Sequence, residues 1–134
     1  MIERFQGDPP SPYEVAFGFS RVVKAGPFIL VGGTTSVDVD GVVIGGSPYE
    51  QTIEVLGKIE HELSRVGAGL ADVIQTRFYV TQISRAEECG RALGDVFGEL
   101  APLMTLVEVS GLIDPRMLVE IEAVAYVPAA SAGS

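Results

Sequence analysis

The chain has 134 residues and a mass of 14.2 kDa, and 47% hydrophobic against 20% charged residues provide the core of one compact domain. A net charge of −9 and a pI of about 4.4 argue against a nucleic-acid partner, because a phosphate backbone would be repelled. Mean hydropathy is +0.34, yet no run approaches the ~18 uninterrupted apolar residues of a membrane span. A small monomer has too much surface for its volume to bury this much apolar content, so we expect a soluble, closed homo-oligomer.

Cys89 and His61 are the only residues of their kinds. We expect a buried, unreactive Cys89, a solvent-facing His61, and neither metal nor cofactor, because the usual zinc spacings are missing. The start "MIERFQGDPPSPYE" lacks the basic-then-apolar order of a secretion signal. We therefore expect a cytoplasmic protein without disulfides.

In chain order, a proline-rich entry precedes two β-rich runs in "FSRVVKAGPFILVGG", and the "KAGP" between them predicts a hairpin. The following "TTSVDVDGVVIGGS" predicts a smaller hairpin or an ordered loop. A helix should then run from the cap Ser47, with Pro48 in its first turn, to Gly67. Its apolar residues recur at steps of three and four, so it should cover a sheet.

A strand is predicted in "VIQTRFYVT", a second helix in "SRAEECGRALGDVFGEL", and two last strands in "LMTLVEV" and "MLVEIEAVAYV". The "SGLIDPR" segment between these strands predicts a turn, so we expect them to be adjacent and antiparallel. The whole order predicts an α+β fold, with both helices packed on one face of one sheet. We expect a single domain over residues 1–127 and a disordered tail over 128–134.

Side-chain alternation assigns the two faces of the last strand. Met117, Val119, Ile121, Ala123 and Ala125 should face the helices, and Leu118, Glu120, Glu122, Val124 and Tyr126 the other side. If Met104 lies opposite Glu122, then Met104, Leu106 and Glu108 share the face of the glutamates. That face is either a solvated sheet surface or a subunit interface with a half-buried cleft.

Three segments resemble one known family: "GFSRVVKAGPFILVGG", "QTIEVLGKIEHELSRVGAGLADVIQTRFYVT" and "VEIEAVA". They are similar to the Rid family of imine and enamine deaminases, also described as endoribonuclease L-PSP-like proteins. The resemblance implies a chorismate-mutase-like fold with a mixed sheet, a homotrimeric barrel with the helices outside, and small-molecule clefts between subunits. Family deaminases hold the substrate carboxylate with an Arg in a P-A-R-S/T-x-V-x-V segment. Met104 occupies that Arg position here, and the resemblance therefore implies an Arg-lacking subgroup.

The same resemblance implies the roles of the other site residues. Glu120, the first Glu of "VEIE", corresponds to the family residue that positions the attacking water and would be catalytic. Phe19 replaces the family tyrosine, and Val31, Gly32, Gly33 and Thr34 replace the family's V-S-G-Q stretch. We therefore expect these substrate-binding residues: Phe19, Gly33, Thr34, Met104 and Thr105. Arg21 joins them because it shares its strand parity with Phe19 and would supply a displaced cation, the alternative being a solvated strand residue.

Two functions follow as hypotheses, and a third is disfavoured. The first is a homotrimeric deaminase that hydrolyses the C=N bond of a small, relatively apolar imine or enamine, with Glu120 as general base. The second is a non-catalytic small-molecule-binding or regulatory trimer, in which Glu120 only hydrogen-bonds the backbone or Arg77. A ribonuclease conflicts with the negative charge and with the missing cluster of basic residues.

Overall fold

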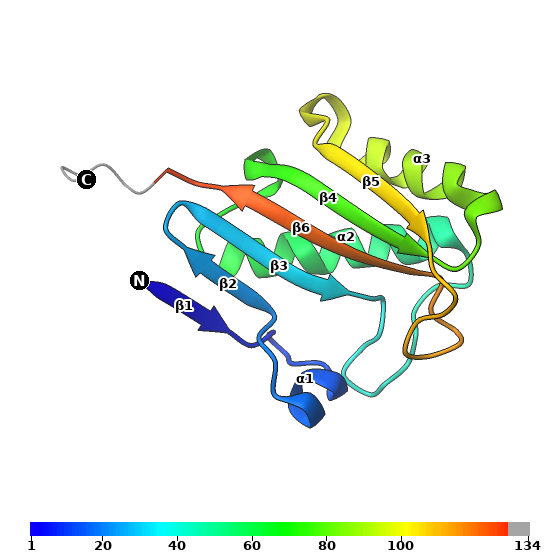
Figure 1. Ribbon diagram of the computed structural model, residues 1–134, viewed down its shortest axis with the longest axis horizontal. Coiled ribbons are helices and arrows are strands. Elements are labelled where there is room, and N and C mark those ends of the chain that lie inside the picture. Colours follow the sequence, from blue (N-terminus) through cyan, green and yellow to red (C-terminus); the bar gives the residue numbers. More distant parts are fainter. Residues whose placement is uncertain (129–134) are drawn as a thin grey trace.

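The computed structural model describes residues 1–128 and contains one six-stranded sheet with the order β1-β2-β3-β6-β4-β5. The strands are β1 (Ile2–Phe5), β2 (Val22–Ala25), β3 (Phe28–Thr34), β4 (Val73–Val80), β5 (Leu103–Glu108) and β6 (Val119–Tyr126). All neighbouring strands are antiparallel except β4 and β5, which are parallel. The sheet is therefore mixed, as expected, and β1 and β5 form its two edges (Figure 1).

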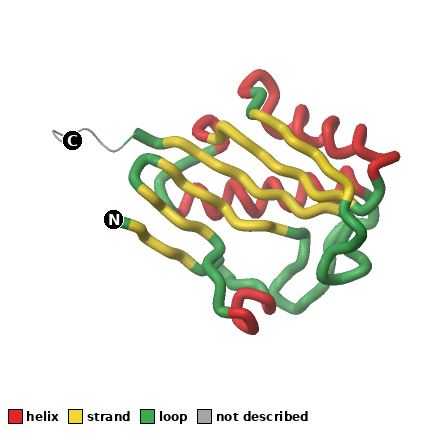
Figure 2. Tube along the Cα trace, viewed as in Figure 1, coloured by secondary structure: helices red, strands yellow, loops and turns green. Residues whose placement is uncertain are grey.

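The helices are α1 (Pro12–Phe17), α2 (Pro48–Arg65) and α3 (Ala86–Phe97), with short 3₁₀ turns at Leu70–Asp72, Ile83–Arg85 and Gly98–Leu100. Figure 2 shows the sheet as one layer and the two longer helices as a second layer against one of its faces. The expected α+β arrangement is confirmed. No helix within residues 1–128 is both long enough and apolar enough to cross a membrane.

The start of α2 follows from local hydrogen bonding. Ser47 caps the helix because its hydroxyl accepts a hydrogen bond from the Glu50 N–H at 3.1 Å, and Pro48 occupies the first turn, where no N–H donor is needed. The helix ends at Arg65, and Gly67 takes a left-handed conformation with φ +85°. Both ends thus lie within two residues of the predicted helix.

The core lies between this helical layer and the sheet. The face of β6 predicted to be covered is fully buried, with Val119, Ile121 and Ala125 at 0% exposure. Val55, Leu56, Ile59 and Leu63 of α2 pack against it at 0% exposure. A central strand buried this well requires neighbours on both sides, which β3 and β4 provide.

The predicted pairing of the last two strands is wrong. β6 lies between β3 and β4, and β5 instead pairs in parallel with β4, so Met104 lies opposite Thr76 rather than Glu122. The turn signal in "SGLIDPR" belongs to a connection that passes from the sheet edge to its centre, not to a hairpin. Met104 and Leu106 consequently lie on the helix-covered face, partly buried against the core, and do not share the face of the glutamates.

Two further points concern the ends of the chain. Neither β1 nor α1 was predicted, because the first residues read only as a proline-rich entry. The tail expected at residues 128–134 lies, apart from Pro128, outside the described residues.

Candidate active site

Glu120 lies in the middle of the sheet, on the face that the helices leave open. Alternation along β6 places Glu120 and Glu122 on this face, and both are partly buried. On β4, Tyr79 lies directly opposite Glu120, and its hydroxyl donates a hydrogen bond of 2.5 Å to Oε1 of Glu122. The phenol therefore engages Glu122, while the Glu120 carboxylate has no hydrogen-bond partner within residues 1–128.

Gly33 makes room for the Glu120 carboxylate. The β3–β6 register shifts between Val31 and Thr34, which brings the Gly33 backbone against the glutamate side chain. A Cβ at Gly33 would stand 3.0 Å from Cδ and 3.1 Å from Oε2 of Glu120. Any larger residue at position 33 would therefore press on the carboxylate.

The Glu120 side chain borders a cavity of about 370 Å³ at the end of the sheet near α1. Its walls come from α1, the strand ends and the loop before β6, and include Tyr13, Phe17, Phe19, Arg21, Gly33, Thr35, Leu112 and Ile113. Phe17 and Phe19 are adjacent, with ring centroids 6.4 Å apart. A carboxylate among aromatic and aliphatic walls suits a small ligand of low polarity.

The surroundings of Glu120 favour its protonated form. Burial raises the pKa of the Glu120 carboxyl above its usual value, the neighbouring Glu122 charge raises it further, and the Arg21 charge acts in the opposite direction. A carboxyl group of this kind exchanges a proton more readily near neutral pH than an ordinary glutamate does. That property suits a general base that later acts as an acid.

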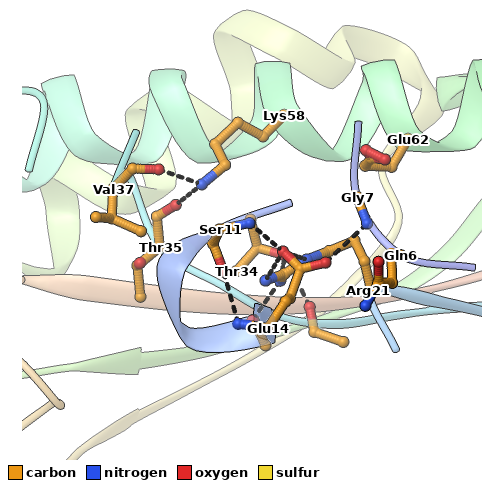
Figure 3. Close-up of polar contacts among 12 residues, drawn as sticks. Gln6, Gly7, Ser11, Glu14, Arg21, Thr34, Thr35, Val37, Lys58 and Glu62 are labelled. Atoms are coloured by element: carbon orange, nitrogen blue, oxygen red, sulfur yellow. Dashed lines mark hydrogen bonds and ion pairs between the residues drawn. The ribbon is translucent and has the colours of Figure 1, made fainter. Parts of the chain in front are cut away.

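Arg21 is held in place by four hydrogen bonds (Figure 3). Its Nη1 donates to the Gly33 carbonyl at 2.6 Å and to the Thr34 hydroxyl at 3.0 Å, and its Nε and Nη2 donate to Oε2 of Glu14 at 3.3 and 3.0 Å. The Arg21 guanidinium thus fixes the backbone of Gly33, which lies beside the Glu120 side chain. Because Arg21 is paired with a buried carboxylate, its charge is largely neutralised within the chain.

Glu14 belongs to a capping box at the start of α1. The Ser11 hydroxyl accepts from the Glu14 N–H, and the Glu14 carboxylate accepts from the N–H groups of Ser11 at 2.8 Å and Gly7 at 2.7 Å. Burial alone would raise the pKa of Glu14, but these backbone donors and the Arg21 guanidinium together lower it. Glu14 therefore remains ionised and fixes both α1 and Arg21.

The structure brings together only part of the predicted site. Phe19, Arg21 and Gly33 line the cavity with Glu120. Thr34 is buried beside them, and its hydroxyl donates to the Gly32 carbonyl at 2.7 Å, so its proton is already engaged. Met104 and Thr105 lie on the edge strand β5, two strands from β6, and only Thr105 is on the Glu120 face.

Sequence reasoning missed Glu14 and the residues of α1 that wall the cavity. The sequence "SPYE" (Ser11–Glu14) contains the S-x-x-E spacing of a capping box, and this signal predicts a helix start there. The loop residues Leu112 and Ile113 carry no such signal. Their position depends on the connection between β5 and β6.

Comparison with known proteins gives one consistent result. Residues 11–127 match the sequence model of the family described as endoribonuclease L-PSP. An uncharacterized protein of Streptomyces coelicolor is 39% identical over 116 residues, which are 87% of this chain and 87% of that protein. The 3-aminoacrylate deaminase RutC of Acinetobacter baylyi is 31% identical over 125 residues, covering 91% and 94% of the two chains.

A solved structure agrees with this. The crystal structure of a Mycobacterium tuberculosis protein, described as a member of the YjgF/YER057c/UK114 family, has a TM-score of 0.83 and 42% identity to this chain. The match covers 95% of this chain and 100% of the mycobacterial one. The sheet and helices described above are therefore the fold of that family.

Proposed function

Because the chain belongs to the endoribonuclease L-PSP family, also called the YjgF or Rid family, we propose that it hydrolyses the C=N bond of a small uncharged imine and releases ammonia. An enamine would react after conversion to its imine form. The observation that carries the proposal is the Glu120 carboxylate, which contacts Gly33 at the border of a cavity with mostly apolar walls and has a raised pKa. The deaminase named among the relatives supports the reaction class.

The reaction needs one group that first takes a proton and then gives it back. The Glu120 carboxylate takes a proton from water as the water oxygen bonds to the imine carbon, and the C=N π electrons move to nitrogen. The protonated Glu120 then donates that proton to nitrogen. This gives a carbinolamine with one hydroxyl and one NH2 group. The Glu120 carboxylate next takes the hydroxyl proton and delivers it to that nitrogen, the C–N bond breaks, ammonia leaves, and the C–O bond becomes the carbonyl of the product. Atoms and charges balance without a cofactor.

The electrostatics of the cavity favour an uncharged substrate. Two carboxylates, Glu120 and Glu122, share this sheet face, and the Arg21 charge is paired with Glu14. A substrate carboxylate in the Glu120 cavity would meet repulsion from Glu120, and Arg21, the one cation among the described residues that line this cavity, is already paired. Met104, which stands where family deaminases place their Arg, supports the same conclusion. The substrate named for the Acinetobacter relative, 3-aminoacrylate, carries a carboxylate, so we propose a different substrate for this chain.

We further propose that the working unit is a homotrimer in which the open sheet face is covered. That face exposes Phe28, Leu30, Leu103, Val107 and Tyr126, each at 42% or more. Such a cluster of apolar side chains is typical of an interface. Because Thr105 lies on the edge strand β5 and on the open face, a neighbouring subunit would bring it to the Glu120 cavity.

The test compares two imines generated in the cuvette. A flavin amine oxidase forms an uncharged imine from a primary amine, and an amino-acid oxidase forms an imine with a carboxylate. We expect the protein to accelerate ammonia release from the uncharged imine at least tenfold more than from the carboxylated one, since a lost bidentate contact costs ~1.5–3 kcal/mol. Preference for the carboxylated imine would contradict the proposed substrate class. Thermal stabilisation by ligand without turnover would favour the binding-protein alternative.

A further inference from the structure

A second cavity, of about 390 Å³, lies between α2, the N-terminal segment 7–11 and the loop 37–39. Arg21 lines both this cavity and the one beside Glu120, but Glu120 itself does not reach it. Lys58 lines this cavity, and Figure 3 shows its side chain extending from α2 toward Thr35 and Val37. Nothing in the proposed deamination uses this amine.

The Lys58 Nζ atom has a defined geometry. It donates hydrogen bonds to the Thr35 carbonyl at 2.6 Å and to the Val37 carbonyl at 2.8 Å, and it has no third acceptor within the described residues. A lysine ammonium has three N–H donors, whereas the neutral amine has two N–H donors and one lone pair. Loss of one proton therefore leaves both hydrogen bonds intact, with the lone pair at the remaining position.

We propose that Lys58 is a modification site that adds to small α,β-unsaturated carbonyl compounds entering this cavity. The amine nitrogen forms a bond to the β-carbon as the C=C π bond breaks, and the proton lost by nitrogen ends on the α-carbon. No oxidant, reductant or leaving group is needed. The product is a secondary amine, which in its protonated form has two N–H donors and keeps both carbonyl partners. A Schiff base or an amide has at most one N–H and loses at least one of them.

The charges around Lys58 decide how much neutral amine is present. Burial lowers the pKa of Lys58 to about 8 and the Arg21 charge adds to this effect, while Glu14, Glu54 and Glu62 oppose it. The other titratable groups lining the cavity are Asp8, Asp38 and His61. At pH 7.5 about a quarter of such an amine is neutral, against about 0.1% for a lysine of ordinary pKa ~10.4. The lower basicity offsets part of this gain, and a rate advantage of about tenfold remains.

The chain provides its own control, because Lys24 is its only other lysine. We would treat the protein with methyl vinyl ketone at pH 7.5 and quantify each adduct by mass spectrometry after cleavage at glutamate. We expect Lys58 to react about tenfold faster than Lys24, with a rate that levels off above pH 8. Equal rates at the two lysines, or a Lys58 rate that keeps rising to pH 10, would overturn the proposal. The α-amino group and Cys89 lie in other peptides and are counted separately.

Entry through the cavity is tested with Gly57, an exposed residue of α2 that lines it. A Cβ at this position meets no atom within 4 Å, so substitution should not disturb the helix. We expect Gly57→Leu to slow the modification of Lys58 severalfold and to leave Lys24 unchanged. The matched variant Gly57→Ala should leave both rates unchanged. Equal Lys58 rates in the two variants would contradict the proposed route.

Discussion

Gly33 and Glu120 are in contact across the β3–β6 pair, and a Cβ at Gly33 would lie 3.0 Å from the Glu120 Cδ atom. The glycine is needed here for space, since its backbone φ lies outside the left-handed range that favours glycine. The position of the carboxylate therefore depends on the absence of a side chain on the neighbouring strand.

Gly33→Ala should lower activity more than stability. The added methyl group displaces the flexible end of Glu120 by a few tenths of an ångström, and we expect kcat/KM for the uncharged imine to fall about tenfold. Gly32→Ala is the matched control, because a Cβ there stands 3.5 Å from the Arg21 carbonyl oxygen, an ordinary contact. Equal activity in the two variants would contradict the role given to Gly33.

Glu14→Gln should destabilise the fold, because the Arg21 guanidinium and its carboxylate partner are both buried, with side chains 7% and 2% exposed. Removing the charge of one partner should lower the free energy of unfolding by about 3 kcal/mol, as measured by urea denaturation. Because the pKa of Glu14 is lowered on folding, its contribution is present above its unfolded pKa and is lost as pH falls. The difference between wild type and variant should therefore shrink in acid.

The control for that experiment is Glu88→Gln. Glu88 pairs with Arg85 on the surface, where solvent screens the charges, so loss of this pair should change the free energy of unfolding far less than loss of the buried pair does. If Glu14→Gln is as mild as the control, the buried pair does not hold α1 and Arg21 as described.

The stability of the protein should depend on pH in alkaline solution through Lys58. Its pKa falls from ~10.4 in the unfolded chain to about 8 on folding. Between these values the unfolded state binds the proton more tightly, so the free energy of unfolding should rise with pH, by up to about 3 kcal/mol. Urea denaturation at pH 7, 8.5 and 10 should show this rise in wild type. It should be missing in Lys58→Met, and an identical slope in the variant would refute the shift.

The open sheet face should control assembly. Light scattering should give a mass near three times 14.2 kDa for wild type. Leu30→Lys, which places a charge on that face, should shift the protein toward monomers. Val42→Lys, at a similarly exposed position in the loop before α2, should leave the mass unchanged. A monomeric wild type at micromolar concentration would contradict the trimer.

Much of the fold could be predicted from local patterns. The alternation in β6 and the three-to-four spacing in α2 identified the buried faces, since burial of one face imposes these periods on the sequence. Strand order could not be predicted in this way. The connection between Glu108 and Val119 has the turn signals of a hairpin, but it does not form one. The central place of β6 goes with its buried face and with its pairing to both β3 and β4.

Family matches predicted Glu120, Phe19 and Gly33 as site residues, and strand parity with Phe19 added Arg21. The structure places these four residues around one cavity, and their roles stay predictions. The predicted face of Met104 was wrong because it was derived from an incorrect strand pairing. Glu14 was missed because its role depends on hydrogen bonds to Arg21 and Gly7, which are seven residues away on either side.

The pH dependence of activity should report the ionisation of Glu120. A general base must be ionised, so kcat/KM should fall as the solution becomes more acidic than the raised pKa of Glu120. The Glu122 charge contributes to that rise. Glu122→Gln should therefore move the acidic limb of the pH profile to lower pH while keeping most of the maximal rate. An unmoved limb would mean that Glu120 does not control the profile.

The most direct test of the account is ammonia release from the uncharged imine by Glu120→Gln, with Glu122→Gln as the matched control. The amide at position 120 keeps the shape of the side chain but takes no proton from water. We expect kcat/KM to fall at least ~100-fold in Glu120→Gln and to stay within about tenfold of wild type in Glu122→Gln. Thermal unfolding should confirm that both variants are folded. Ammonia release by folded Glu120→Gln at the wild-type rate would show that Glu120 is structural and would contradict the proposed mechanism.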